Sequence, residues 1–137
     1  MVTTRRLRIP LAAPLCLVAA SALPAEKKGF EARWKEAEQN VRSGAGEKYF
    51  NDVFFKEMLG GKYATHMTEC AQRTGEKMMV DLNAAVELGR RGQVLAVLVR
   101  PESKPSRCFA DLMKRDTFSA PPSDHFWIPV TIHFTEK

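Results

Sequence analysis

Two apolar segments separated by a glycine-bounded turn limit what this chain can fold into. In residues 80–88 the apolar residues fall at every second position, as in a strand with one face buried and the other face in solvent. Residues 89–92 (Gly-Arg-Arg-Gly) can make a tight reversal, and residues 93–100 form a second apolar segment. The pattern predicts an antiparallel hairpin.

The second strand of this hairpin is apolar on both faces. Its side chains divide into two sets, which are Val94, Ala96 and Leu98 on one face and Leu95, Val97 and Val99 on the other. Such a strand needs cover on both faces, so we expect residues 94–99 to be central in the sheet and slowest in hydrogen exchange. The set Leu95, Val97 and Val99 is the candidate partner surface, unless another part of the chain covers it.

The C-terminal part of the chain predicts one more helix and one more strand. Ser103 and Pro105 begin a helix that turns Cys108 inward. Residues 126–134 alternate in hydropathy again, and Pro129 favours an edge position because proline donates no hydrogen bond. The expected fold class is α+β, with a helical N-terminal half followed by a small antiparallel three-stranded sheet with helices packed on it.

The first half of the chain has a helical period. The apolar stripe of its first helix consists of Phe30, Trp34, Ala37 and Val41. This helix stops at residues 43–46, and further helices are expected at residues 47–59, before a Gly-Gly pair, and at residues 62–73. We expect the first helix to cover Leu95, Val97 and Val99. The alternative covers are a second protomer, which would make a homo-oligomer, or the partner.

Residues 1–22 have the composition of a secretory signal peptide. Three arginines precede an apolar stretch at residues 9–20, and residues 20–22 (Ala-Ser-Ala) form a small-residue cleavage motif. The apolar stretch is 12 residues long, whereas a helix that spans a bilayer needs about 20. Cleavage after Ala22 or Ala25 would give a periplasmic or secreted protein without a transmembrane anchor.

The charge of the chain argues against one class of partner. The formal net charge of +5 includes the three arginines of the leader, and the rest of the chain has 18 basic and 16 acidic residues. A chain so close to neutrality has no electrostatic basis for binding nucleic acid or an anionic membrane. We therefore expect a protein partner, and about 115 residues after cleavage correspond to one domain.

Export also changes what the cysteines indicate. The leader contains Cys16, so two cysteines remain, and an even number in an oxidising compartment indicates a disulfide between Cys70 and Cys108. The alternative, a metal carrier, would take its ligands from His66, Met67, Cys70, Cys108 and His133. The chain has no C-x-x-C or H-x-x-H spacing, and we expect no cofactor.

Several motifs in the second half of the chain match a known family. They are Gly92-Gln93-Val94, Val97, Val99, Pro101-Glu102-Ser103, a helix with Ala110, Phe118-Ser119-Ala120-Pro121, and the strand at residues 130–134. Together they resemble the TonB C-terminal domain superfamily, and more narrowly its cysteine-bearing version in gliding-motility-associated proteins. The resemblance covers about residues 62–134, and Cys70 and Cys108 fall at the cysteine positions of that version.

The resemblance implies a periplasmic binding module with a mixed sheet, helices on one face and an edge strand able to pair with a partner. It divides the chain into an N-terminal helical segment (26–60) and a TonB C-terminal-like domain (61–137). The family members that transduce energy have an uncleaved membrane anchor and a proline-rich spacer, which this sequence does not show. The aromatic pair before the family's proline is also reduced to Phe118. We therefore do not expect force transmission.

A small secreted hydrolase is the remaining alternative. It would use His125, which follows Ser123 and Asp124, or His133. Neighbours in sequence do not by themselves form a catalytic relay, and the chain lacks G-x-S-x-G, a phosphate-binding glycine loop and C-x-x-C-H. We expect no catalytic residue, and the sequence favours a non-enzymatic interaction module.

Overall fold

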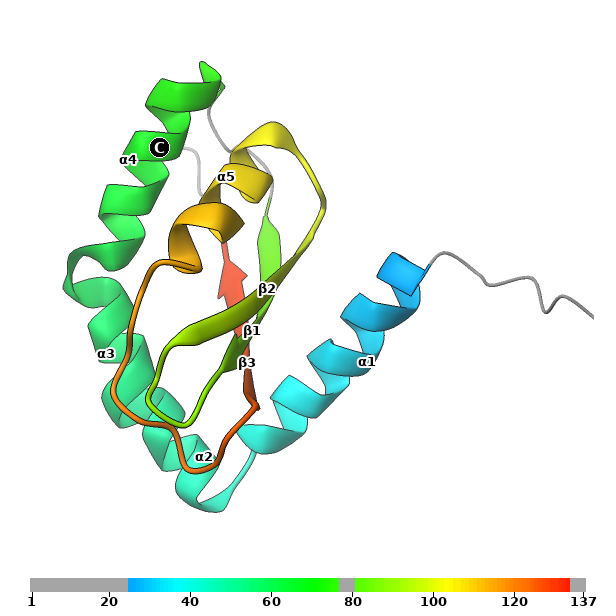
Figure 1. Ribbon diagram of the computed structural model, residues 1–137, viewed down its shortest axis with the longest axis vertical. Helices are drawn as coiled ribbons and strands as arrows, with labels where there is room; N and C mark the ends of the chain where they lie inside the picture. The colour runs from blue at the N-terminus through cyan, green and yellow to red at the C-terminus, as the bar shows by residue number, and fades with distance from the viewer. Residues whose placement is uncertain (1–24, 77–80, 134–137) are drawn as a thin grey trace, which may run out of the picture.

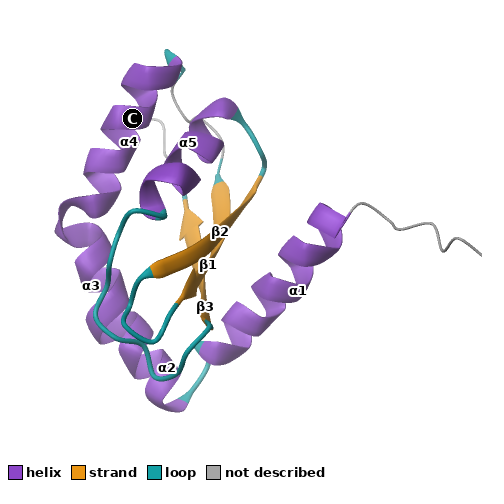
Figure 2. Cartoon of the chain, in the orientation of Figure 1, coloured by secondary structure: helices purple, strands orange, loops and turns teal. Residues whose placement is uncertain are grey.

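The computed structural model describes residues 25–76 and 81–133, with side chains from residue 29 onward. Its elements, in chain order, are α1 (Ala25–Asn40), α2 (Gly44–Tyr49), η1 (Phe50–Phe54), α3 (Phe55–Glu57), η2 (Met58–Lys62), α4 (Tyr63–Thr74), β1 (Leu82–Leu88), β2 (Val94–Arg100), α5 (Lys104–Met113) and β3 (Phe126–Ile132), and η1 and η2 are π-helical (Figure 2). The predicted α+β class is confirmed. The predicted signal peptide and residues 80 and 134 of the predicted strands lie outside the described residues.

The three strands form one antiparallel sheet in the order β2-β1-β3 (Figure 1). Ala84 in β1 pairs with Val99 of β2 on one side and with Val130 of β3 on the other. Helix α5 and the helical run at residues 44–74 pack on one face of the sheet, and α1 packs on the opposite face. The mixed sheet with helices on one face, which the family resemblance implied, is therefore wrong for this chain.

The prediction that residues 94–99 are central in the sheet is also wrong. The central strand is β1, and among the strands of the described residues β2 pairs with β1 alone. Because helices cover both faces of the sheet, β2 is apolar on both faces although one of its edges has no neighbouring strand. The hydropathy of a strand indicates whether its two faces are covered. Its position in the strand order depends instead on which backbones pair with it. The position of β3 at an edge, expected from Pro129, is confirmed.

A β-bulge in β2 changes which of its residues share a face. Glu87 of β1 lies opposite Ala96, but the next residue, Leu88, lies opposite Val94, so Leu95 is an extra residue without a partner. The side chains on either side of the bulge therefore lose strict alternation. Three valines of β2 pack in the main core, and they are Val94, Val97 and Val99. The two face sets predicted from alternation are wrong for this reason.

The hairpin turn is fixed by Gly92, which has a φ of +82° and touches the loop before β3. The Phe118 amide donates a hydrogen bond to the Gly92 carbonyl at 2.8 Å. A Cβ at position 92 would lie 1.8 Å from the Phe118 carbonyl oxygen, so only glycine fits both the backbone conformation and this contact.

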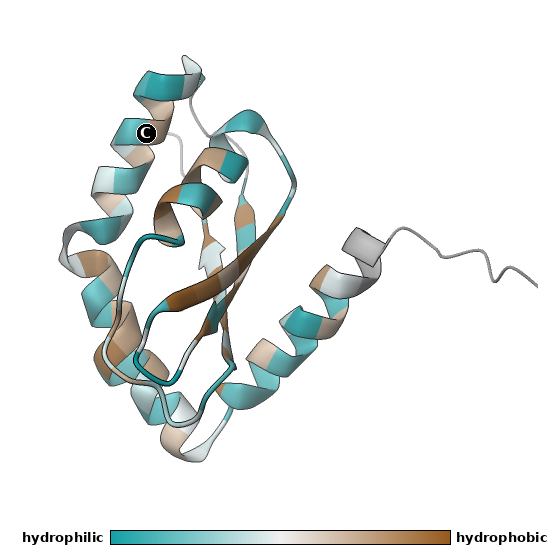
Figure 3. Cartoon of the chain, in the orientation of Figure 1, coloured by the Kyte–Doolittle hydropathy of each residue, from teal (hydrophilic) through white to brown (hydrophobic). Residues whose placement is uncertain are grey.

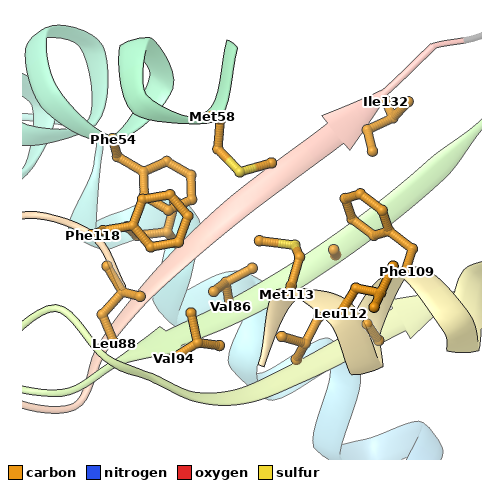
Figure 4. Close-up of a cluster of buried hydrophobic side chains, with 14 of the residues drawn as sticks. Phe54, Met58, Val86, Leu88, Val94, Phe109, Leu112, Met113, Phe118 and Ile132 are labelled. Atoms are coloured by element: carbon orange, nitrogen blue, oxygen red, sulfur yellow. The ribbon is translucent and has the colours of Figure 1, made fainter. Parts of the chain in front are cut away.

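The main core lies between the sheet, α5 and the helical run at residues 44–74 (Figure 4). The ring of Phe54 packs against that of Phe118 at 4.6 Å between centroids, and Phe109 of α5 is fully buried. In Figure 3 the hydrophobic colouring concentrates on the strands, α5 and the segment around α3. The helical run changes direction at Gly61, whose φ of 130° is not helical, near the break expected from the Gly-Gly pair.

Helix α1 builds a second, smaller core on the opposite face of the sheet. Phe30 and Ala37 of α1 are buried there with Ala85 of β1 and Trp127 of β3. The face of β1 that carries Ala85 is therefore largely covered, and our expectation that this face is in solvent is wrong there. Helix α1 also packs against Ala96 and Leu98 of β2, and not against Leu95, Val97 and Val99 as we expected. The bulge explains the difference, because it places the valines on the α5 face.

Candidate functional site

The predicted disulfide is confirmed. Cys70 of α4 and Cys108 of α5 are bonded, with their Cα atoms 5.7 Å apart, inside the usual range for disulfides. Cys70 is buried and Cys108 is partly exposed. The bond fastens α4 to α5, so it joins the helical half of the chain to the sheet.

The residues of the proposed metal carrier do not come together as a ligand set. Both sulfur atoms of Cys70 and Cys108 are used in the disulfide. The Nε2 atom of His66 instead lies 2.6 Å from the Asp116 carboxylate, in a largely buried pair. Within residues 25–76 and 81–133, no three His, Cys, Asp or Glu side chains are placed to hold a metal ion.

The three histidines all face carboxylates, which the sequence did not reveal. His125 is exposed and lies 3.4 Å from Glu87, and the Nδ1 atom of His133 lies 2.9 Å from Asp81. His66 has the largely buried partner Asp116. In the described part of the chain, no hydroxyl or thiol is hydrogen-bonded to any of these imidazoles. The geometry therefore presents no nucleophile beside a histidine base.

The three residues of the predicted partner surface are separated. Val97 is buried in the main core and Val99 is partly buried against it. Leu95 is 42% exposed at the bulge in the edge strand β2. Only Leu95 is thus available as a large exposed apolar side chain in this set.

An apolar opening lies at the other edge of the sheet, along β3. A groove with a volume of about 490 Å³ runs between α1 and the helical run, with the outer edge of β3 as its floor. Its lining residues are Trp34 and Glu38 from α1, Phe50, Phe54, Phe55, Met58, Leu59 and Tyr63 from the helical run, and Pro129, Val130, Thr131, Ile132 and His133 from β3 and its end. We call it the β3 groove.

The wall of the β3 groove formed by the helical run is apolar and open to solvent. Phe55 is 50% exposed and Leu59 is 62% exposed, and they lie four residues apart on the same side of the run. Large apolar side chains this exposed in one groove are typical of a binding surface. Burial raises the pKa of Tyr63 at the end of this wall, so its hydroxyl stays protonated at neutral pH.

The floor of the β3 groove has backbone groups to which no described residue makes a hydrogen bond. The Trp127 carbonyl accepts a hydrogen bond from the Asn40 side chain of α1 at 3.0 Å, so alternate residues of β3 from Trp127 onward direct their backbone groups away from β1. Next along this edge are the Pro129 carbonyl and both backbone groups of Thr131. Nothing in residues 25–76 and 81–133 makes a hydrogen bond to these three groups.

Polar contacts join the helical run to the loop between α5 and β3, and we call them the tether. Glu57 accepts hydrogen bonds from the amide of Ser119 at 3.0 Å and from its hydroxyl, and the Tyr49 hydroxyl donates to the Ser119 carbonyl at 2.5 Å. Burial and the nearby Glu57 carboxylate raise the pKa of Tyr49, so this donor keeps its proton. The tether therefore fastens the helical run to the loop that leads into β3.

The sequence predicted a helix at residues 47–59 but did not predict the groove. A signal was present in the adjacent pairs Phe54-Phe55 and Met58-Leu59. Neighbours on a helix point about 100° apart, so both members of a pair rarely reach the same core. In the structure Phe54 and Met58 are buried and their neighbours are exposed.

No protein-family model, no curated protein and no solved structure matches this chain. Among the described residues, no helix combines the length and the hydropathy needed to cross a bilayer.

Proposed function

We propose that this protein is an exported interaction module that binds an extended segment of a partner protein along the edge of β3. The observation that carries the proposal is the β3 groove. In it, an edge strand whose outer backbone groups have no partner among the described residues lies beside the exposed side chains of Phe55 and Leu59. No enzymatic step is part of the proposal.

Strand addition uses both features of the β3 groove. An added strand would form backbone hydrogen bonds with the Pro129 carbonyl and with Thr131, and these bonds supply affinity without regard to sequence. Its side chains would lie against the two walls, which supply selectivity. Without such an occupant, an open edge beside exposed apolar side chains is a risk for aggregation.

The proposal also places the protein in an oxidising compartment outside the cytoplasm, which requires export. The Cys70–Cys108 disulfide supports it because such bonds form and persist in oxidising compartments, and the leader-like residues 1–22 support it independently. The relation to the TonB C-terminal superfamily stays a proposal. It is supported by the order helix, hairpin, helix and strand in the second half of the chain and by the positions of the two cysteines.

Export predicts a shortened N-terminus. Protein recovered from its native cell is expected to begin at residue 23 or 26, because cleavage would follow Ala22 or Ala25. Intact mass and N-terminal sequencing measure this, and thiol titration of the denatured protein is expected to find no free cysteine. A chain that retains Met1 and three free thiols would contradict export.

The groove predicts that one exposed leucine matters for binding and another does not. Peptides selected from a random display library on the purified protein are expected to bind Leu59→Glu at least about tenfold more weakly, because the variant places a charge in an apolar wall. The matched control is Leu95→Glu, which changes an exposed leucine at the opposite edge of the sheet. Its peptide affinity is expected to equal that of the original protein, as measured by fluorescence anisotropy.

The reverse result would contradict the proposal. If Leu95→Glu loses the peptides and Leu59→Glu keeps them, the partner surface lies on β2, near the set first predicted from the sequence. Circular dichroism of both variants checks that they are folded, which is expected because both side chains are exposed.

A further inference from the structure

The two walls of the β3 groove differ in chemistry, and this difference bears on what an added strand must look like. The wall formed by the helical run contains Phe55, Met58 and Leu59 and is apolar. The wall formed by α1 contributes Trp34 and the carboxylate of Glu38, which lies one helical turn further along α1.

The two faces of β3 lead to these two walls. Val130 and Ile132 pack against the main core, on the side of the helical run, whereas Trp127 packs in the smaller core under α1. Because side chains alternate along a strand, Thr131 shares the α1 side with Trp127. A strand added to this edge continues the sheet, so its successive side chains would point alternately to the apolar wall and to the α1 wall.

The α1 wall suits a cation. Glu38 is exposed, and within the described part of the chain no basic side chain forms an ion pair with it. Trp34 beside it offers an aromatic ring, to which a cation is attracted. The same layer already contains two such contacts: the Arg33 guanidinium lies 5.2 Å from the Trp127 ring centroid, and the Arg100 guanidinium lies 5.0 Å from that of Phe30.

Building on the proposed function, we infer that the β3 groove selects an extended segment in which apolar residues alternate with lysine or arginine. The apolar residues lie against Phe55, Met58 and Leu59. The basic residues lie over Trp34 and pair with Glu38. A segment with acidic residues at the alternate positions would place like charges together at Glu38 and binds more weakly.

Three peptides test this selectivity on the purified protein. Each has about six residues, the length of an average strand, and alternates valine with lysine, with threonine or with glutamate. Isothermal titration is expected to show the lysine peptide binding about tenfold more tightly than the threonine peptide, from one ion pair and one cation–π contact, with the glutamate peptide weakest.

Variants of Glu38 identify the residue responsible. Glu38→Gln is expected to reduce the preference for lysine, and Glu38→Lys is expected to reverse the order of the lysine and glutamate peptides. The matched control is Glu102→Gln, an exposed carboxylate beside the opposite edge of the sheet, which is expected to leave the order unchanged.

The possible failures separate the two proposals. If all three peptides bind equally and Leu59→Glu weakens all three, the charge rule is wrong and the groove still binds strands. If none of the peptides binds, or if Leu59→Glu leaves their binding unchanged, both the charge rule and the groove as a strand-binding site are overturned.

Discussion

Replacing Cys108 by alanine is expected to lower the free energy of unfolding by about 4 kcal/mol. The disulfide joins residues that are 38 apart in the sequence, and in the chain-entropy treatment a loop of this length restricts the unfolded state by about that amount. For a domain of this size the loss corresponds to a fall of roughly 15 °C in Tm, measured by circular dichroism.

Two controls connect this loss to the bond itself. The double variant Cys70→Ala, Cys108→Ala removes the free thiol that the single variant leaves buried in α4. Its Tm is expected to agree with that of the original protein after reduction. A single variant with an unchanged Tm would show that the covalent link between α4 and α5 contributes nothing to stability.

Truncation of Phe109 to alanine is expected to destabilise the protein by about 3–5 kcal/mol. Phe109 is fully buried in the main core and packs edge-on against Tyr63, with 6.3 Å between ring centroids. Removal of its ring leaves a cavity that the sheet and α4 cannot fill completely. Urea unfolding followed by fluorescence measures the change in the midpoint and in the free energy.

The matched truncation, Phe55→Ala, is expected to change stability by no more than about 0.5 kcal/mol, because half of the ring is already in solvent. The same variant is expected to weaken peptide binding, since Phe55 lines the β3 groove. Equal losses of stability in the two variants would mean that Phe55 belongs to the core and that the groove is not an open surface.

Features that depend on a few neighbouring residues could be predicted from the sequence. The hairpin, the edge position of β3 and the start of α5 were predicted, and at α5 the Ser103 side chain accepts a hydrogen bond from the Ser106 amide. The disulfide could also be predicted, because it followed from the count of cysteines and the expected compartment. The hairpin, the edge strand and the helix start depend on local turn, proline and cap chemistry, whereas the disulfide required only the number of cysteines and the compartment.

The features that the sequence did not predict depend on long-range placement. The bulge at Leu95 exists only relative to the register of β1, and a single extra residue reassigns every side chain beyond it. The β3 groove forms where residues about 70 or more positions apart, such as Leu59 and Thr131, meet at one edge. The adjacent apolar pairs at residues 54–55 and 58–59 indicate side chains outside the core, but no local pattern shows which segment they meet.

Pro129 has a consequence for how accurately a bound strand is aligned. On the open edge it offers a carbonyl but no N–H, so a guest strand could exchange a full pair of hydrogen bonds opposite Thr131 but not opposite Pro129. A slip by two residues would move that pair onto Pro129 and forfeit one hydrogen bond, about 1 kcal/mol. A slip by one residue would exchange the two walls for every side chain. In the proposed binding mode Pro129 would therefore disfavour the slip by two residues, and different guests are expected to share one alignment.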